Sequence, residues 1–145
     1  MDEVLAEFLA ETGENLQTLD AAVLELEQRP GDRELLRSIF RTIHTIKGTC
    51  SFLGLARLEA VAHAAENVLV LLRDGALTAS PEVVSDVLAA IDVIRAIVEA
   101  LETTQVEPDG DDRALIAALD RWAGQPTTTE PSDELFAAAL EAAAA

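Results

Sequence analysis

A histidine, a lysine and a glycine lie within one short segment that has the apolar spacing of a helix. They are His44, Lys47 and Gly48, and Lys47 is the only lysine of the chain. An imidazole nitrogen can act as a nucleophile, and a nearby ammonium group can neutralise charge on a phosphoryl group. At about 100° per residue, a mostly basic stripe runs beside the apolar face of this helix. The stripe consists of Arg37, Arg41, His44, Gly48 and Ser51, and Lys47 lies between it and the apolar residues Leu36, Ile39, Phe40, Ile43, Ile46 and Cys50.

Gly48 is an unusual residue for the middle of a helix. A glycine there costs about 1 kcal/mol relative to alanine, and the local pattern contains no turn signal. A position without a side chain, one turn after His44, lets the surface of another molecule approach the imidazole without a clash. We therefore expect a partner to bind along this stripe, at Arg37, Arg41, Gly48 and Ser51.

The second histidine, His63, belongs to the next predicted helix, together with Glu66. A short turn joins the two helices, so they should be antiparallel neighbours whose flanking side chains meet. We expect Glu66 to accept a hydrogen bond from Nδ1–H of His44, which leaves Nε2 as a directed nucleophile. Lys47 would neutralise charge on a phosphoryl group at Nε2. The residues alone also allow simpler interpretations: a histidine at the core edge, an ordinary lysine on a helix flank and a solvated glutamate.

Other kinds of site are disfavoured by the motifs. His44, His63 and Glu66 are chemically suitable metal ligands, but neither H-E-x-x-H nor paired Glu-x-x-His motifs occur, so we expect no metal site. The sequence contains no Gly-rich phosphate loop and no serine in a nucleophile motif. We therefore expect the chain to bind no ATP and no other cofactor itself.

The composition indicates one acidic, helical domain with a substantial core. The chain has 145 residues, half of them hydrophobic, and a formal net charge of -17 from 27 acidic and 10 basic residues. This charge disfavours nucleic acid as a partner. The single cysteine, Cys50, excludes an internal disulfide and is expected to be a buried thiol in a reducing compartment. No signal-peptide pattern and no membrane-spanning segment occur, so we expect a soluble, cytoplasmic protein.

Five helices are predicted from apolar residues at three- and four-residue spacing. Asp32 and Ser80 are expected to cap the second and fourth helices, and Gly54 and Gly75 to end the second and third. The expected fold class is all-α, an antiparallel four-helix bundle with a short fifth helix. The predicted helices span residues 2–28, 33–52, 55–74, 81–102 and 111–122.

The predicted domain covers residues 1–123. Residues 124–131 have the composition of a linker, and Ser132 then opens an alanine-rich segment that reaches residue 145. We expect residues 132–145 to form a marginal helix, or to begin a linker toward further domains.

Short motifs surround the two histidines: Ile39-Phe40-Arg41, His44-Thr45-Ile46-Lys47-Gly48, Phe52-Leu53-Gly54-Leu55, His63 and Glu66-Asn67. Together they resemble the histidine phosphotransfer (HPt) domain of CheA-type chemotaxis histidine kinases. The resemblance implies the five-helix fold of that family, with His44 phosphorylated at Nε2 and Glu66 orienting it. It also implies that Lys47 stabilises phosphoryl charge, that His63 is an additional neighbour and that Gly48 is a close-approach position.

Two functional hypotheses follow. In the first, which the resemblance implies, the chain is a phosphocarrier of a bacterial chemotaxis two-component system. A CheA-type kinase catalytic domain phosphorylates His44, and an aspartate of a CheY-like or CheB-like response regulator takes the group. ATP and Mg²⁺ are then bound by these partner domains, and the isolated chain turns nothing over. The alternative is a non-catalytic helical-bundle interaction module, for which His44 would be dispensable.

Overall fold

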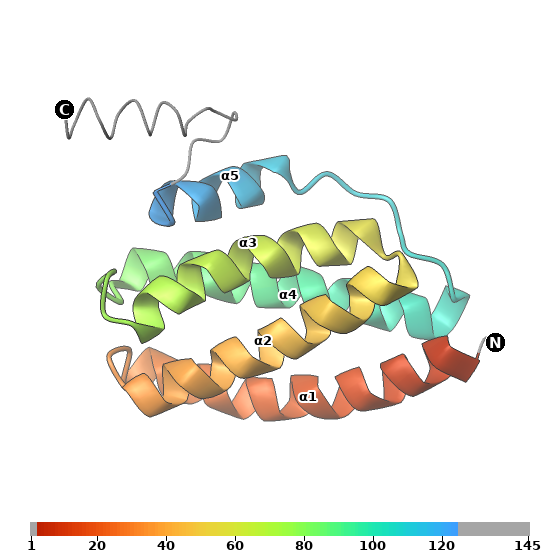
Figure 1. Cartoon of the computed structure of the whole chain (residues 1–145), viewed down its shortest axis with the longest axis horizontal. Helices are drawn as coiled ribbons and strands as arrows, with labels where there is room; N and C mark the ends of the chain where they lie inside the picture. The colour runs from red at the N-terminus through yellow and green to blue at the C-terminus, as the bar shows by residue number, and fades with distance from the viewer. Residues whose placement is uncertain (1–2, 125–145) are drawn as a thin grey trace.

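The computed structural model describes residues 3–124, which form five α-helices and contain no strand (Figure 1). The expected all-α class and helix order are confirmed, and each helix end lies within two residues of its predicted position. The alanine-rich segment 132–145, and all of the predicted linker except Gly124, lie outside the described residues. The helices are α1 (Glu3–Gln28), α2 (Arg33–Leu53), α3 (Ala56–Arg73), α4 (Pro81–Thr104) and α5 (Arg113–Trp122).

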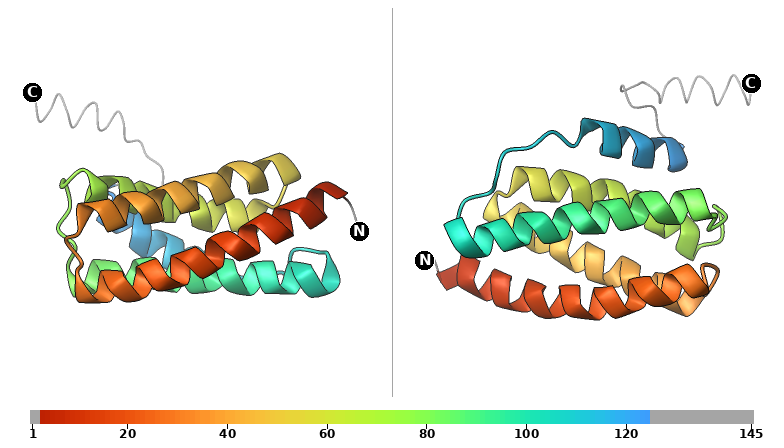
Figure 2. Two further views of the ribbon diagram at one scale, coloured as in Figure 1. Left: turned by 90° about the horizontal axis from the view of Figure 1, so that it is seen from below. Right: turned by 180° about the vertical axis from the view of Figure 1, so that it is seen from behind.

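The first four helices form a bundle in which consecutive helices run antiparallel. Both α1 and α3 pack against α2 and α4, and α2 and α3 make the most extensive contact of any pair. The short α5 packs on α3 and α4, on the side of the bundle away from α1 (Figure 2). None of the described helices has the combination of length and apolar content that a membrane span needs.

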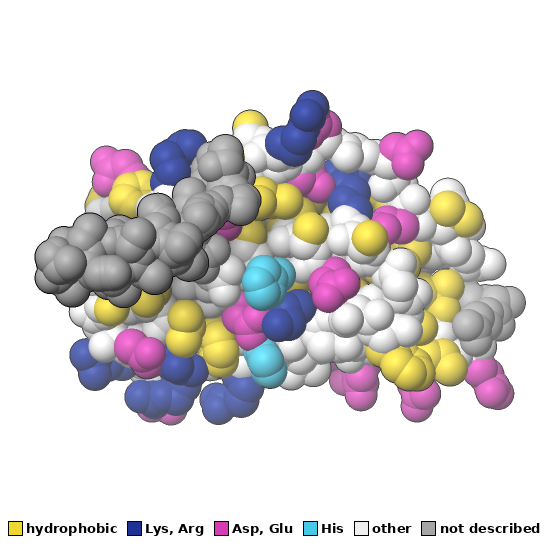
Figure 3. Space-filling view, turned by 45° about the horizontal axis from the view of Figure 1, so that its top comes forward, with side chains coloured by type: hydrophobic (Ala, Val, Ile, Leu, Met, Phe, Trp, Pro, Cys, Tyr) yellow, Lys and Arg dark blue, Asp and Glu magenta, His cyan; other side chains and the backbone are white. Residues whose placement is uncertain are grey.

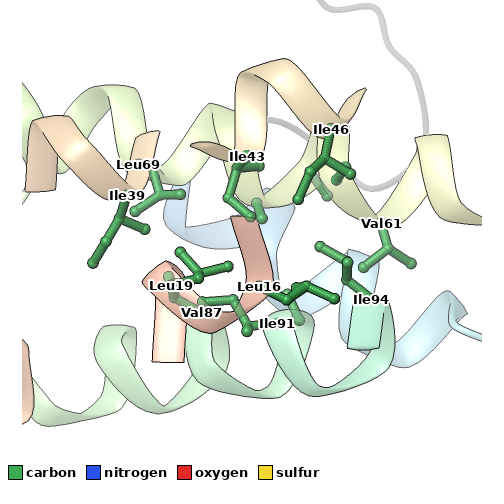
Figure 4. Packing of buried hydrophobic residues seen from close by; sticks show 14 of the residues in the cluster. Leu16, Leu19, Ile39, Ile43, Ile46, Val61, Leu69, Val87, Ile91 and Ile94 are labelled. Carbon is green, nitrogen blue, oxygen red and sulfur yellow. The ribbon is translucent and has the colours of Figure 1, made fainter. Parts of the chain in front are cut away.

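The apolar face of α2 supplies the centre of the core. Ile39, Ile43 and Ile46 are at most 1% exposed. Their side chains point toward those of α1 and α4, such as Leu16 and Ile91 (Figure 4). Burial of each such side chain contributes about 1.5–3 kcal/mol relative to an exposed position. This packing fixes the rotation of α2 about its axis, so the stripe on its other face must point outward.

Cys50 belongs to the same buried face. Its side chain is fully buried, as expected, and its Sγ lies 3.3 Å from the carbonyl oxygen of Lys47. Burial raises the pKa of the Cys50 thiol to about 12, and the negative charge of Glu59 adds to the effect. The thiol is therefore protonated at neutral pH and has no nucleophilic role in the chemistry of the nearby histidine.

Local caps define the ends of α2 and the start of α4. Oδ1 of Asp32 accepts hydrogen bonds from the backbone N–H groups of Glu34 and Leu35, at 3.1 and 3.2 Å. Ser80 caps α4 in the same way through Val83, and Gly54 ends α2 with a left-handed φ of 73°. All three caps were predicted from the sequence.

The start of α3 is capped by a distant residue. Its N-cap position, Leu55, offers no side-chain hydrogen bond. Glu107, in the connection between α4 and α5, instead accepts hydrogen bonds from the backbone N–H groups of Arg57 (3.2 Å) and Leu58 (2.7 Å). The Arg57 guanidinium donates to both carboxylate oxygens of Asp112, at 2.7 and 3.0 Å. We call these contacts the α3 clasp, since they hold the connection to the first turn of α3.

The clasp and a second contact determine where α5 lies. The prediction that α5 begins at Asp111 was wrong by two residues, because Asp112 binds Arg57 and Asp111 binds the side chain of Arg113 (2.9 Å). At the other end of α5, Nε1–H of Trp122 donates to Asp86 of α4 at 2.7 Å.

Candidate functional site

His44 lies at the middle of α2 and points away from the core. Ile43 and Ile46, on the core face of the same helix, are fully buried. The His44 side chain is 60% exposed. The imidazole is therefore accessible from outside while its backbone is held by a packed helix.

Glu66 of α3 joins His44 to Lys47. Nδ1–H of His44 donates to Oε2 of Glu66, and Oε1 of the same carboxylate lies 2.9 Å from Nζ of Lys47. Glu66 is only 8% exposed, which excludes its interpretation as a solvated acid. The seam between α2 and α3 thus brings together three of the predicted site residues.

The environment of Glu66 favours its ionised form. Burial by itself raises the pKa of a carboxyl group, but the hydrogen bonds and positive charges of His44 and Lys47 outweigh burial. The net effect is a pKa of Glu66 below its ordinary value of 4.5. An ionised carboxylate can only accept a hydrogen bond, so the proton of a neutral His44 belongs on Nδ1, and the free lone pair belongs on Nε2.

Glu66 is expected to make the stability of the domain depend on pH. Because its pKa is lower in the folded than in the unfolded state, it stabilises the fold above its ordinary pKa, and this contribution is lost as the pH falls through the lower, folded value. We expect Glu66→Gln to lower the free energy of unfolding near pH 7 and to reduce the loss of stability that follows as the pH falls below the ordinary pKa of Glu66. Urea denaturation at several pH values measures both effects.

The matched control is Glu99→Gln, which removes an exposed carboxylate from α4. It changes the net charge equally but breaks no contact with His44 or Lys47. If both variants changed the pH dependence of the free energy of unfolding equally, a specific role of Glu66 would be contradicted.

His63 lies on the same surface as His44 but makes a different interaction. Figure 3 shows both histidine side chains (cyan) on one face, with a basic side chain between them and acidic ones beside it. Within residues 3–124, no hydrogen bond or ring contact joins the two histidines. His63 acts on Asp120 of α5: burial raises the pKa of Asp120, and the charge of His63 opposes this rise.

The predicted partner-binding residues all lie on the outward stripe of α2. Arg37, Arg41, Gly48 and Ser51 are exposed, and Arg37 forms an ion pair with Glu34 at 2.8 Å. A Cβ atom added at Gly48 would meet no other atom within 4 Å. No contact within the described chain therefore requires glycine at this position.

The described residues offer no cluster of metal ligands at the histidines. No three or more His, Cys, Asp or Glu side chains of residues 3–124 gather as metal ligands. A cavity of about 370 Å³ lies between α1 and α4, where Leu26, Pro81 and Leu88 line it. His44 is instead an exposed group, which suits a reaction between two proteins.

Comparison with known proteins identifies the family. Residues 3–124 match the family model of the Hpt domain. The chain belongs to the Hpt domain family. The matched range coincides with the five described helices.

Curated relatives similar to this Hpt domain include chemotaxis proteins. Chemotaxis protein CheA of Halobacterium salinarum is 34% identical over 139 residues, which cover 92% of this chain and 21% of that protein. Sensor histidine kinase CheAY of Helicobacter pylori is 38% identical over 104 residues, 72% of this chain and 13% of that protein. The chain thus spans about a fifth or less of the length of these curated relatives.

Two solved structures match the Hpt domain over nearly their whole length. The phosphorylated P1 domain of CheA3 in complex with CheY6, from R. sphaeroides, has a TM-score of 0.77 and 29% identity, covering 86% of this chain and 98% of that one. The solution structure of the histidine phosphotransfer domain of CheA has a TM-score of 0.75 and 27% identity, covering 90% and 99%.

Sequence reasoning assigned no functional role to two aromatic side chains on the helix that carries the histidine of this Hpt domain. Phe40 was expected on the core face, but it is only partly buried because it lies at the edge of that face, with its ring against His44. Phe52 is 79% exposed and lies one turn beyond Gly48, next to Ser51 of the outward stripe. Its spacing from His44 was the available signal, because residues 44, 48 and 52 follow one another at four-residue intervals.

Proposed function

We propose that this Hpt domain carries phosphoryl groups for a CheA-type histidine kinase. A separate kinase catalytic domain transfers the γ-phosphoryl group of ATP to Nε2 of His44. An aspartate of a CheY-like, or CheB-like, response regulator then accepts the group. Because the proposed phosphoryl source is ATP bound to a kinase domain, we place this activity in the cytoplasm.

One observation carries the proposal: His44 is anchored at Nδ1 by a buried, ionised carboxylate, while 60% of its side chain is exposed. This arrangement fixes the tautomer and directs the lone pair of Nε2 outward, as a nucleophile needs. It also supplies a compensating charge. The imidazole becomes positive as its lone pair is shared, and Glu66 stabilises that charge in the way that an aspartate stabilises the histidine of a catalytic triad.

The first transfer makes a nitrogen–phosphorus bond. The Nε2 lone pair attacks the γ-phosphorus of ATP, the bond to the bridging β–γ oxygen breaks, and ADP leaves with that electron pair. The Nδ1 proton remains in its hydrogen bond to Glu66. Mg²⁺, held by the kinase domain, neutralises the phosphate charge during this step. Lys47 forms an ion pair with the same Glu66 carboxylate that binds His44. We assign to Lys47 the stabilisation of the phosphoryl group once that group is bound to His44.

The second transfer returns the domain to its starting state. A carboxylate oxygen of the receiver aspartate attacks the phosphorus in line with the Nε2–P bond, and the electron pair of that bond returns to Nε2. Mg²⁺ belongs to the receiver in this step, as it belongs to the kinase in the first. Neither transfer needs a cofactor bound by this chain.

The outward stripe of α2 is the surface on which both partners would bind. Gly48 leaves room beside His44, and the exposed Phe52 offers an apolar contact one turn further along. Arg37 and Arg41 give this stripe positive charge in a chain whose net charge is -17. They would therefore steer an acidic partner surface toward His44, since charges at an interface rim mainly raise the association rate.

The test measures the mass of the intact domain after incubation with ATP, Mg²⁺ and a CheA-type kinase core. We expect a gain of one phosphoryl group that is lost in acid, as a nitrogen–phosphorus bond requires. Addition of a CheY-like receiver should remove the group. A receiver whose acceptor aspartate is replaced by asparagine should leave it in place.

If no kinase core phosphorylates the domain, transfer in the reverse direction, from receiver to His44, must also be measured. If several kinase cores fail, receivers phosphorylated beforehand offer the group from the other direction. Absence of transfer in both directions would overturn the proposal and favour a non-catalytic interaction module.

A further inference from the structure

The aromatic ring of Phe40 lies against the imidazole of His44. The two ring centroids are 5.7 Å apart, and the ring planes differ by only 17°. Phe40 lies one helical turn before His44, so both rings project from the same side of α2. His44 therefore has two neighbours that restrain its ring, Glu66 at Nδ1 and Phe40 at its face.

Phe40 is itself held by a cation from α3. The guanidinium carbon of Arg73 lies 4.5 Å from the centroid of the Phe40 ring, a cation–π contact. The side chain of Arg33 reaches Gly75, which shows that the end of α3 lies beside the start of α2. Arg73 thus approaches Phe40 from the N-terminal direction of α2, whereas His44 lies on its C-terminal side. Guanidinium, phenyl and imidazole form a row along the seam between α2 and α3.

A hydrogen bond at Nδ1 cannot by itself fix the direction of the Nε2 lone pair. The lone pair lies in the plane of the imidazole, and a ring held by its Cβ–Cγ bond and by one hydrogen bond can still tilt to a limited extent. With 60% of the side chain exposed, few other contacts oppose this motion. A stacked ring opposes it directly, because tilting the imidazole separates the two faces.

We propose that Phe40 is a positioning residue for phosphoryl transfer: by stacking on His44, it fixes the plane of the imidazole, and Arg73 holds Phe40 in place. This inference rests on the proposed function. The orientation matters for a donor that approaches from one direction, because in-line attack tolerates little misalignment of the reacting atoms. A small donor that diffuses freely can instead approach along whatever direction the lone pair takes.

The test compares these two kinds of donor. Phe40→Leu removes the ring but keeps apolar bulk, and Phe40→Tyr keeps the ring. With ATP, Mg²⁺ and a CheA-type kinase core, we expect Phe40→Leu to lower the rate at saturating domain concentration about tenfold, with little change in the half-saturating concentration. With phosphoramidate, a small donor that phosphorylates histidine, the rate of Phe40→Leu should stay within about twofold of the wild-type rate. Phe40→Tyr should retain the wild-type rate with both donors.

Each result decides between positioning and a general structural role. A loss with both donors would show damage to the fold or to the reactivity of His44, and would overturn the proposal. A wild-type rate with the kinase core, or an effect on half-saturation alone, would overturn it too. If Phe40→Leu fails to fold, Arg73→Met replaces it. That variant should slow kinase-dependent transfer about threefold while Arg73→Lys keeps most of the rate.

A spectroscopic readout separates this proposal from the function on which it rests. The ring current of Phe40 should shift the NMR signals of the His44 ring protons in wild type and in Phe40→Tyr, and the shift should disappear in Phe40→Leu. Unchanged signals in Phe40→Leu would overturn the stacking role. Failure of wild type to exchange phosphoryl groups with kinase cores or receivers would instead overturn the proposed function, while the NMR comparison still decides whether Phe40 fixes the ring.

Discussion

Replacement of His44 by glutamine is expected to abolish phosphorylation, whereas replacement of His63 by glutamine should leave a stoichiometry of one phosphoryl group per chain. These are the only two histidines of the sequence. Within residues 3–124, only His44 has a carboxylate on Nδ1, which orients Nε2 and balances the positive charge that develops on the ring. Intact-mass measurement with ATP, Mg²⁺ and a kinase core gives both stoichiometries directly.

The two variants also control for each other. Both positions are exposed, so glutamine at either site should leave the core intact. In His44→Gln, Glu66 keeps its contact with Lys47. If phosphorylation persisted in His44→Gln, or disappeared in His63→Gln, the phosphoryl group would reside on His63 and not on His44.

Gly48→Gln is expected to have opposite effects on stability and on transfer. The new side chain meets open space within the described chain, and it replaces a glycine in a helix interior. The free energy of unfolding should therefore rise by up to about 1 kcal/mol. Transfer from a kinase core and to a receiver should fall by about two orders of magnitude, because the side chain projects from the surface that a partner must approach to reach His44. Urea denaturation and transfer rates measure the two effects.

Gly13 offers a matched control for this prediction. It lies inside α1, and a Cβ atom added there likewise meets nothing within 4 Å. Gly13→Gln should stabilise the domain by a similar amount and leave transfer unchanged. Rapid transfer by Gly48→Gln would mean that partners approach His44 from another side. Loss of stability in Gly48→Gln would mean that glycine is needed there for the fold itself.

The parts of the fold that depend on local chemistry could be predicted from the sequence. The apolar periodicity located all five helices, and the predicted caps Asp32, Ser80 and Gly54 are present. The end of α4 was placed too early because no glycine or proline marks it. The hydroxyl groups of Thr103 and Thr104 bind carbonyl groups one turn back, and Gln105 ends the helix with a φ of 61°.

The parts that depend on which helices meet could be predicted only in outline. The spacing of His44 and Glu66 indicated a contact across the α2–α3 seam, but not the burial of Glu66, which depends on how closely the two helices approach. The simultaneous contact of Glu66 with Lys47 and the stack of Arg73 on Phe40 also depend on that approach. No sequence pattern connects Glu107 to the backbone of Arg57, because the two residues are 50 positions apart and neither belongs to a motif.

The α3 clasp has a consequence for the order in which a newly made chain gains its shape. The helix that carries Glu66 has no local cap, and the carboxylate that completes its first turn is Glu107. During synthesis from the N-terminus, both histidines leave the ribosome well before Glu107 and Asp112 do. We therefore expect the first turn of α3 to gain these hydrogen bonds only after the connection that follows α4 has left the ribosome, so the helix that carries Glu66 is completed late.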